Sequence, residues 1–181
     1  MILAQKGFYY DQTTCIGCKA CQVACKDKND SAVGVRYRRV YDVETGKFPN
    51  PRRLHFSISC NHCEEPKCVA NCPTGALEKR KEDGIVIHHY DKCIGCRLCT
   101  WSCPYGAPQY REEEGKVGKC DMCADLLAKG ENPACVDACV MRCLDYGDID
   151  ELRQKHGQNA DAPALPSSKT TKPNIVINVK S

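Results

Sequence analysis

The chain has 181 residues, of which 17 are cysteine, while Leu, Ile, Val and Phe together make up only about 18%. Apolar packing alone gives a small core for this length, so something else must stabilise the fold. The formal net charge of +3 does not indicate a nucleic-acid-binding protein. The mean hydropathy is −0.49, and neither a bilayer-spanning run nor an apolar signal region is visible, so we expect no targeting segment in this chain.

Short elements are predicted between the cysteine-rich segments. Strand-like runs lie at 54–58 (LHFSI) and 85–88 (IVIH), and turn residues directly precede the second of them. Residues 74–81 (TGALEKRK), which follow Pro73, predict a short helix. This mixture of short strands and short helices indicates an α+β fold.

The last 35 residues contain a further helix and a tail. Asp148 is a candidate N-cap with Glu three residues later, and Gly157 ends a helix predicted over 149–156. Residues 158–172 are rich in Ala, Pro, Ser and Thr, and 175–179 (IVINV) predict a strand or strap. Because such a tail has little core of its own, we expect it to lie across this domain or a partner.

The cysteines form an internal repeat. The first and third groups have the spacing C-x2-C-x2-C-x3-C, the second C-x2-C-x4-C-x3-C and the fourth C-x2-C-x11-C-x3-C. The x3 spacing at the end of each group places the last two cysteines about one helical turn apart. The groups are Cys15, Cys18, Cys21 and Cys25; Cys60, Cys63, Cys68 and Cys72; Cys93, Cys96, Cys99 and Cys103; and Cys120, Cys123, Cys135 and Cys139, with Cys143 standing alone.

This spacing favours iron–sulfur clusters. A [4Fe–4S] cube needs four thiolates, and in bacterial two-cluster ferredoxins the fourth cysteine of each C-x2-C-x2-C-x3-C-P motif binds the other cluster. Residues 93–104 match that motif through Pro104, whereas Lys26 and Val140 replace the proline after the first and fourth groups. Zinc is the alternative, most of all for the fourth group taken alone. A disulfide framework does not require four such regular quartets.

These motifs resemble those of the iron–sulfur electron-transfer (beta) subunits in the dimethyl sulfoxide reductase family of molybdenum or tungsten enzymes, and most of all the dimethyl sulfoxide reductase type. The resemblance runs from about Gly7 to Ile177. It rests on 57–68 (SISCNHCEEPKC), 93–110 (CIGCRLC, then CPYGAPQY), 150–157 (DELRQKHG) and 171–177 (TKPNIVI).

The resemblance implies a fold of two ferredoxin-like, two-cluster modules with short strands, short helices and long loops. Residues 1–52 and 109–157 would form the first module and 53–108 the second. Residues 158–181 would be an extended tail or strap at a partner interface.

The family pairs its first motif with its fourth and its second motif with its third, which implies four [4Fe–4S] clusters here. Some relatives have tryptophan at the position of Cys96 and a three-iron cluster, so cysteine there implies a four-iron cluster. The implied ligands are Cys15, Cys18, Cys21 and Cys139 (first set); Cys25, Cys120, Cys123 and Cys135 (second set); Cys60, Cys63, Cys68 and Cys103 (third set); and Cys72, Cys93, Cys96 and Cys99 (fourth set).

Other residues have competing interpretations. Trp101 is interpreted as a packing aromatic, the alternative being that it shields a cluster or meets a membrane subunit. Cys143 is interpreted as a small buried side chain, the alternative being a spare ligand or redox thiol. His62 is not needed as a ligand because the thiolates suffice. Most basic side chains at 36, 38, 39, 52, 53 and 79–81 are expected on a solvated face rather than at a docking site.

The function implied by the resemblance is a non-catalytic electron-transfer subunit with no catalytic residue. It would relay electrons between a molybdopterin- or tungstopterin-containing catalytic subunit, facing the first cluster, and a redox partner at the last cluster. That partner is a membrane quinone subunit or a soluble carrier. A freestanding polyferredoxin carrier is the alternative, which the apolar-ended tail argues against.

The location follows from the partners. We expect a soluble subunit without a membrane span of its own, assembled in the cytoplasm. It would stay there or be exported with a signal-bearing partner to the periplasmic, outer face of the membrane, where a membrane anchor subunit would be a further partner. We expect no nucleic-acid partner.

Overall fold

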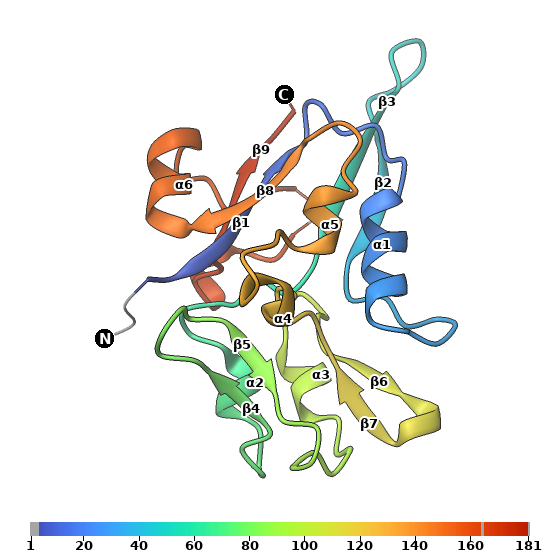
Figure 1. Ribbon diagram of the computed structural model, residues 1–181. Helices are drawn as coiled ribbons and strands as arrows, with labels where there is room; N and C mark the ends of the chain where they lie inside the picture. Colours follow the sequence, from blue (N-terminus) through green and yellow to red (C-terminus); the bar gives the residue numbers. More distant parts are fainter. Residues whose placement is uncertain (1–3, 164, 181) are drawn as a thin grey trace.

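The computed structural model describes residues 4–163 and 165–180 and has the expected α+β composition (Figure 1). The strands are β1 (Lys6–Asp11), β2 (Arg39–Thr45), β3 (Arg52–Ile58), β4 (Leu77–Lys79), β5 (Val86–His88), β6 (Gln109–Arg111), β7 (Lys116–Gly118), β8 (Leu144–Asp148) and β9 (Ile175–Asn178). The helices are α1 (Ala20–Lys28), α2 (Lys67–Ala70), α3 (Leu98–Ser102), α4 (Ala124–Leu127), α5 (Ala134–Asp137) and α6 (Ile149–His156), with 3-10 turns η1 (Glu112–Glu114) and η2 (Ser168–Thr170).

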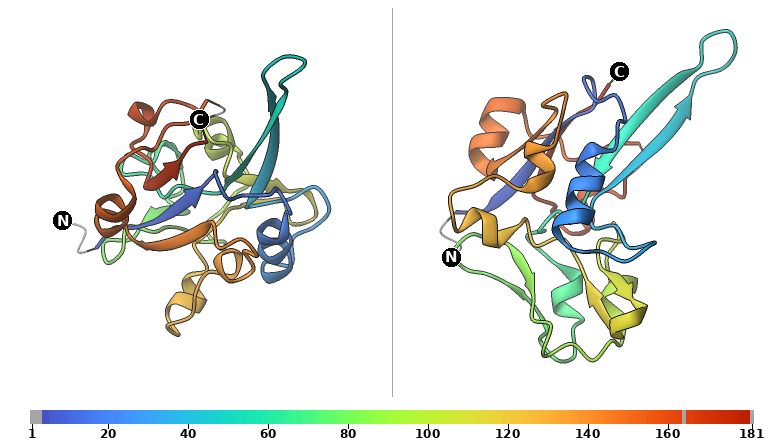
Figure 2. Two further views of the ribbon diagram at one scale, coloured as in Figure 1. Left: turned by 90° about the horizontal axis from the view of Figure 1, so that it is seen from above. Right: turned by 45° about the vertical axis from the view of Figure 1, so that its right-hand side comes forward.

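A three-stranded sheet joins the two ends of the chain in the order β8-β1-β9. β1 runs antiparallel to β8 and parallel to β9, so Phe8 lies between Tyr146 and Ile175. The predicted strand in the tail is therefore confirmed as β9, and it completes this sheet. In the left view of Figure 2, β9 lies beside β1.

The remaining strands form three antiparallel hairpins, β2–β3, β4–β5 and β6–β7. The β2–β3 hairpin projects from the body of the molecule in Figure 2. Its base is tied to α1, because Gln22 Oε1 accepts a hydrogen bond from the Val40 N–H at 3.0 Å. The other two hairpins lie with α2 and α3 at the opposite end of the molecule (Figure 1). The strands predicted at 54–58 and 85–88 are confirmed as β3 and β5.

The helix predicted over 74–81 is wrong, because residues 77–79 form strand β4. Gly75 has φ +63°, which interrupts a right-handed helix at the second residue of the run. Leu77 is then paired with His88 and buried beside Cys68 and Cys99. Pairing with β5 and burial of Leu77 override the local helix preference.

The helix predicted over 149–156 is confirmed as α6. The Asp148 side chain accepts a hydrogen bond from the Asp150 N–H at 3.0 Å, one residue earlier than a capping box predicts, and Gly157 ends the helix at φ +91°. Ile149 and Leu152 are buried against Val176 of β9. The tail strand thus has α6 on one side.

The buried interior consists to an unusual degree of cysteine. The largest group of buried apolar side chains includes cysteines of three motifs together with Phe8 and Tyr10 of β1. A second, smaller group surrounds Cys68 and Cys99. None of the helices in the described ranges has both the length and the apolar character needed to cross a membrane.

Candidate metal centres

Two of the cysteine loops, 15–21 and 93–99, follow the same backbone path. Gly17 and Gly95 have φ values of +68° and +69°, a conformation that side chains rarely adopt. A Cβ at Gly17 would overlap the ring of His55, and one at Gly95 would overlap a carbonyl of the β6–β7 turn. Glycine is therefore needed at both positions for the three cysteines of each loop to line one cavity.

The first set lines one cavity. Three of its cysteines come from the first motif, at the start of α1, and the fourth follows α5, so residues more than 110 positions apart meet here. Ile16 and Met141 also line this cavity and are 57% and 43% exposed. The cavity brings together Cys15, Cys18, Cys21 and Cys139.

The third and fourth sets each line a cavity of their own. In each, three cysteines of one motif meet a single cysteine of the other, as reciprocal pairing requires. The cavity of the third set is lined by Cys60, Cys63, Cys68 and Cys103, and that of the fourth set by Cys72, Cys93, Cys96 and Cys99.

The second set lies in the interior beside α1 and α5. Cys25 of α1 and Cys135 of α5 are buried, as are Cys120 and Cys123 before α4. Burial, together with the nearby sulfur of Cys135, raises the pKa of the other three, and α1 packs against α5. The structure thus gathers the first, third and fourth sets each around one cavity and places the second set in the interior.

Three of the four sets surround a cavity. Among the residues that the structure describes, no three or more Cys, His, Asp or Glu side chains converge closely enough to hold one metal ion. Each of the three cavities is lined by all four cysteines of one set, and the first is lined by Cys143 as well. Four cysteines around a cavity fit a cube of several metal ions.

Burial favours the neutral form of several of these thiols in the absence of metal. Burial raises the pKa of Cys25 and Cys63 to about 11, and that of Cys68 to about 12. Cys72 differs: burial opposes ionisation, but backbone hydrogen bonds from Leu77 and Thr74 outweigh it and lower the pKa. Ligation would therefore have to displace protons from several of the buried thiols.

Backbone N–H groups are aimed at several sulfurs. Ala107 donates to Cys103 Sγ at 3.5 Å, and Met122 donates to Cys120 Sγ at 3.4 Å. Such donors stabilise the added negative charge of a reduced cluster and so raise its potential. Each of these N–H donors is positioned by the loop that follows the cysteine. The cysteine spacing alone does not predict such hydrogen bonds.

Cys143 lies inside the first cavity, although it belongs to none of the sets. It is 4% exposed, in agreement with the interpretation as a small buried side chain. Its Sγ lies 3.4 Å from Cys139 Sγ, and its N–H donates to the same sulfur at 3.3 Å. The Cys143 thiol also lowers the pKa of Cys15 by hydrogen bonding. Cys143 is thus a neighbour of two sulfurs of the first set.

The interpretation of Trp101 as a packing aromatic is wrong, because the side chain is 86% exposed. It lies on the outer side of the short helix α3, which leaves no core for the ring to enter. His62 is buried, and its Nδ1 accepts a hydrogen bond from the Val86 N–H at 3.0 Å. Burial, followed by the cation of Lys119, lowers the pKa of His62, so the ring is neutral.

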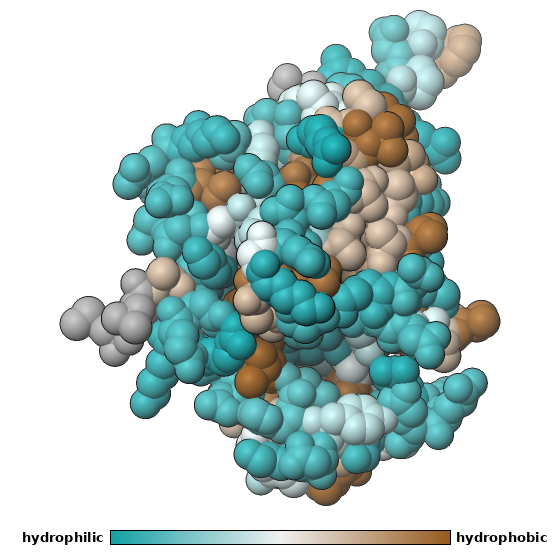
Figure 3. All heavy atoms as spheres, viewed as in Figure 1, coloured by the Kyte–Doolittle hydropathy of each residue, from teal (hydrophilic) through white to brown (hydrophobic). Residues whose placement is uncertain are grey.

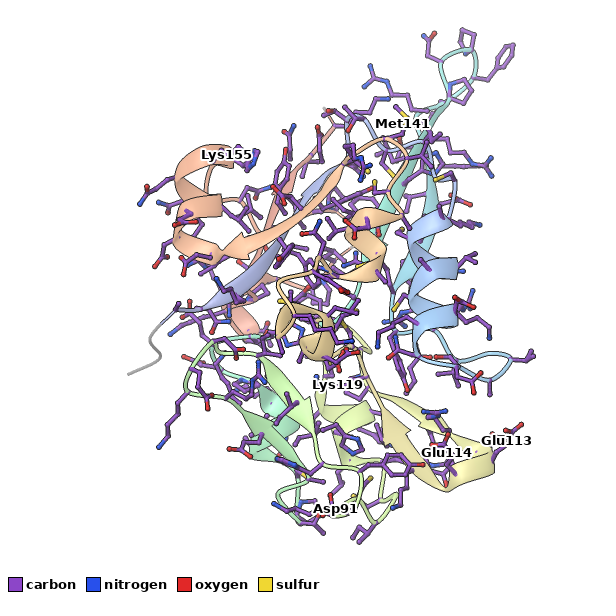
Figure 4. All side chains as sticks on the ribbon, viewed as in Figure 1. Asp91, Glu113, Glu114, Lys119, Met141 and Lys155 are labelled. Atoms are coloured by element: carbon purple, nitrogen blue, oxygen red, sulfur yellow. The ribbon has the colours of Figure 1, made fainter. Side chains whose placement is uncertain are left out.

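The expectation that most of the basic residues lie on a solvated face is wrong, because four of the eight are partly or wholly buried. Arg38 is 2% exposed, and Arg39, Lys79 and Arg80 are half-buried. A further buried cation, Lys119, lies where the two ends of the molecule meet (Figure 4) and donates from Nζ to the carbonyl of Cys120 at 2.6 Å. One feature of the sequence could have indicated that Arg38 is buried. Two hydroxyl side chains, Ser57 and Ser59, lie close together at the end of β3 and accept hydrogen bonds from its guanidinium.

Exposed apolar side chains gather near the first cavity. Figure 3 shows hydrophobic surface over α1 and the segment between α5 and β8, where Figure 4 places Met141. Ile16, Val23 and Val140 are 57%, 63% and 70% exposed. At the fourth set, Ile94 and Trp101 are exposed in the same way. The first and fourth sets, which are the two outer sets, therefore carry exposed apolar surface in the part of the chain that the structure describes.

Comparison with known proteins agrees with this geometry. A family model described as "4Fe-4S dicluster domain" matches residues 52–149, and one described as "4Fe-4S binding domain" matches residues 12–34. The sequence is 50% identical to one chain of the anaerobic dimethyl sulfoxide reductase of Escherichia coli strain K12, and the match covers 96% of this protein and 88% of that relative.

Two further relatives extend the comparison. The sequence is 45% identical to the corresponding chain of the anaerobic dimethyl sulfoxide reductase of Haemophilus influenzae, covering 97% of this protein and 89% of that relative. It is 38% identical to one subunit of the sulfite dehydrogenase of Allochromatium vinosum, covering 81% and 70% respectively. The chain therefore belongs to the dimethyl sulfoxide reductase family of iron–sulfur electron-transfer subunits, which serve oxidoreductase complexes and are not catalytic alone.

Proposed function

We propose that the chain carries four [4Fe–4S] clusters, one in each cysteine set, and relays electrons through them between two partners. The observation that carries this proposal is the set of three cavities, each lined by three cysteines of one motif and one cysteine of another. The second set adds four buried cysteines beside α1 and α5. Each cluster, when bound, accepts and releases one electron.

The pairing of motifs supports two ferredoxin-like modules. The first and fourth motifs contribute to the first and second sets, which lie beside α1 and α5. The second and third motifs contribute to the third and fourth sets, which lie beside α2 and α3. We keep the proposed module boundaries of 1–52 with 109–157 and 53–108, followed by the tail.

The chain's own residues hold and shield the sites. Burial excludes water from the second set, and backbone N–H donors meet sulfurs of the second and third sets. No substrate bond needs to be made or broken by this chain. The apolar residues around the outer sets support docking of a partner at each end.

The names of the relatives suggest the partners. By analogy with dimethyl sulfoxide reductase and sulfite dehydrogenase, we infer a large molybdopterin- or tungstopterin-containing catalytic subunit at the first set. A membrane quinone subunit or a soluble carrier would dock at the fourth set. Met141 near the first set and Asp91 near the fourth lie at opposite ends of the molecule in Figure 4, which suits a relay.

Iron and acid-labile sulfide analysis tests the cluster count. The anaerobically purified protein is expected to contain about 16 iron atoms per chain, four for each cube. Dithionite should bleach its visible absorption and produce signals of several interacting [4Fe–4S] clusters in electron paramagnetic resonance (EPR). An iron content near half of that value, or zinc in place of iron, would refute the proposal.

A pair of neighbouring variants tests the assignment of ligands. Cys139→Ser should remove or convert one cluster and lower the iron content, because it takes a thiolate from the first set. Cys143→Ser changes a buried cysteine of the same cavity that lies outside the four sets. It should keep the full iron content. Loss of iron in Cys143→Ser with retention in Cys139→Ser would reverse the assignment.

A further inference from the structure

Arg38 places a full positive charge in the interior between the first and second sets. Its guanidinium is buried and lies over the Phe8 ring at 4.7 Å. Nη1 donates to Ser57 Oγ at 3.1 Å, and Nη2 donates to Ser59 Oγ at 3.0 Å, while Nε has no hydrogen-bond partner among the described residues. A buried guanidinium cannot lose its proton, so its charge needs a partner of opposite sign.

That partner is not a carboxylate. Within residues 4–163 and 165–180, the ion pairs join other side chains, and none of them includes Arg38. Burial would lower the pKa of Arg38, but nearby sulfurs outweigh this effect and raise it. Those sulfurs belong to Cys135, Cys21, Cys120 and Cys25. When metal is bound, the ligating thiolates of the first and second sets would supply the negative charge that balances Arg38.

Arg38 is also linked to a sulfur of the first set by hydrogen bonds. Its side chain reaches Cys21 through Ser57, whose Oγ lies 3.4 Å from Cys21 Sγ. In the second set, burial raises the pKa of Cys25, and the charge of Arg38 opposes this effect. Because a guanidinium only donates, the Ser57 hydroxyl accepts from Arg38 and can direct its own hydrogen to Cys21. Arg38 thus orients a hydroxyl donor towards a thiolate.

We propose that Arg38 is a positioning residue that supplies the buried positive charge for the first and second clusters and thereby raises their reduction potentials. The inference rests on the proposed function, since it concerns clusters in these two sets. The physical reason is that reduction adds one negative charge, and a fixed cation nearby stabilises the reduced form more than the oxidised form.

The fourth set provides an internal reference. The charges that act on Cys99 are those of other cysteines in its own set, and Arg38 is not among them. A cation that acts only locally should therefore leave the fourth cluster unchanged. General damage to the fold would instead disturb all clusters together.

Redox titration of the iron-loaded full-length protein, followed by EPR, tests this role. Arg38→Gln removes the charge but keeps an N–H donor. It should lower the midpoint potentials of the first and second clusters by about 59 mV or more. For one electron, this shift is a tenfold change in the equilibrium constant between reduced and oxidised cluster. Arg38→Lys keeps the charge and should shift them less. Arg53→Gln removes an exposed charge from the β2–β3 hairpin and should shift none.

A third variant separates the charge from the hydrogen bond. Ser57→Ala keeps Arg38 and removes the hydroxyl that meets Cys21. It should lower one midpoint only, that of the first cluster, because no other set contacts this hydroxyl among the described hydrogen bonds. A shift in several midpoints would refute the link through Ser57.

The outcomes are distinct. Unchanged midpoints in Arg38→Gln with full iron content overturn the proposal, as do equal shifts in the Lys and Gln variants. If Arg38→Gln loses iron while Arg38→Lys retains it, the buried charge is needed to hold the clusters, which supports the proposal. Loss of iron in both variants shows a structural need for the guanidinium and overturns it. Failure of the four-cluster function would appear in the unmodified protein, before any variant is compared.

Discussion

The ammonium of Lys79 joins three segments of the chain around the third cysteine set. Its Nζ donates to Gln5 Oε1 at 2.7 Å, to the carbonyls of His62 and Cys63 at 3.0 and 2.9 Å, and to the carbonyl of Gly84 at 2.8 Å. Lys79→Met keeps the approximate length of the side chain and removes all of these bonds. The carbonyls of the Cys60–Cys63 loop would then lack their donor.

The magnitude follows from the number of donors. An ammonium has three N–H groups, and a hydrogen bond to a charged group contributes about 1.5–3 kcal/mol net. Burial lowers the pKa of Lys79, so removing the charge recovers part of this loss, and the half-exposed side chain reduces it further. We expect a local destabilisation of about 2–4 kcal/mol. Because about 1.4 kcal/mol changes an equilibrium constant tenfold, the equilibrium constant for opening of the Cys60–Cys63 loop should rise roughly thirtyfold or more.

The rate at which iron is lost to a chelator under anaerobic conditions measures this opening. Lys79→Met should lose its first four irons at least about ten times faster than the unmodified protein. Lys81→Met is the matched control, because it makes the same substitution two residues away at an exposed position. Equal rates of iron loss in the two variants would refute the argument that Lys79 secures the loop.

Three other substitutions have defined outcomes. Ile177→Ala should lower the free energy of unfolding by about 2–5 kcal/mol in anaerobic urea titrations, because the side chain is buried in β9. Val33→Ala is the control, since Val33 is exposed and its loss should change the free energy of unfolding little. Similar free energies of unfolding in the two variants would contradict the stabilising role of β9. Trp101→Ala should retain the full iron content but weaken binding of the redox partner by about 2 kcal/mol or more, because the exposed ring is expected at that interface. This free energy corresponds to a roughly thirtyfold increase in Kd. An unchanged Kd would show that the ring is not at the interface. Burial lowers the pKa of His88 to about 4, whereas an unfolded histidine has a pKa of about 6.5. Between these values the unfolded chain binds the proton and the folded chain does not, so the free energy of unfolding should fall as the pH drops from about 6.5 towards 4. His88→Gln should weaken this pH dependence, and an unchanged pH profile in the variant would contradict the reasoning.

The elements that sequence predicted are those with local signals. The helix at 149–156 has a cap at each end, and β3 and β5 are apolar runs bounded by turns. Residues 74–81 failed because their helix preference is local, whereas the pairing of β4 with β5 and the burial of Leu77 are tertiary. The parallel pairing of β9 with β1 has no local signal at all.

The candidate sites divide in the same way. Cysteine spacing predicts iron–sulfur sites with three ligands in one segment, whereas the fourth ligand of each set follows only from the resemblance to the family. The spacing cannot predict what surrounds these ligands. Arg38 belongs to a basic run that resembles a solvated surface, and its burial depends on Ser57 and Ser59 from the next strand and the residue after it. Trp101 lies between ligands of one motif, so its exposure depends on how short α3 is.

The pairing of β9 with β1 determines when the protein can finish folding during synthesis. Asp11 and Asn178 bond to each other across 167 positions, so the ribosome must make nearly the whole chain before the three-stranded sheet is complete. Contacts between such distant segments form slowly and late. The second and third motifs, by contrast, lie close in sequence and can meet while the tail is still being translated. The three-stranded sheet that contains β1 can therefore be completed only after β9 has been synthesised.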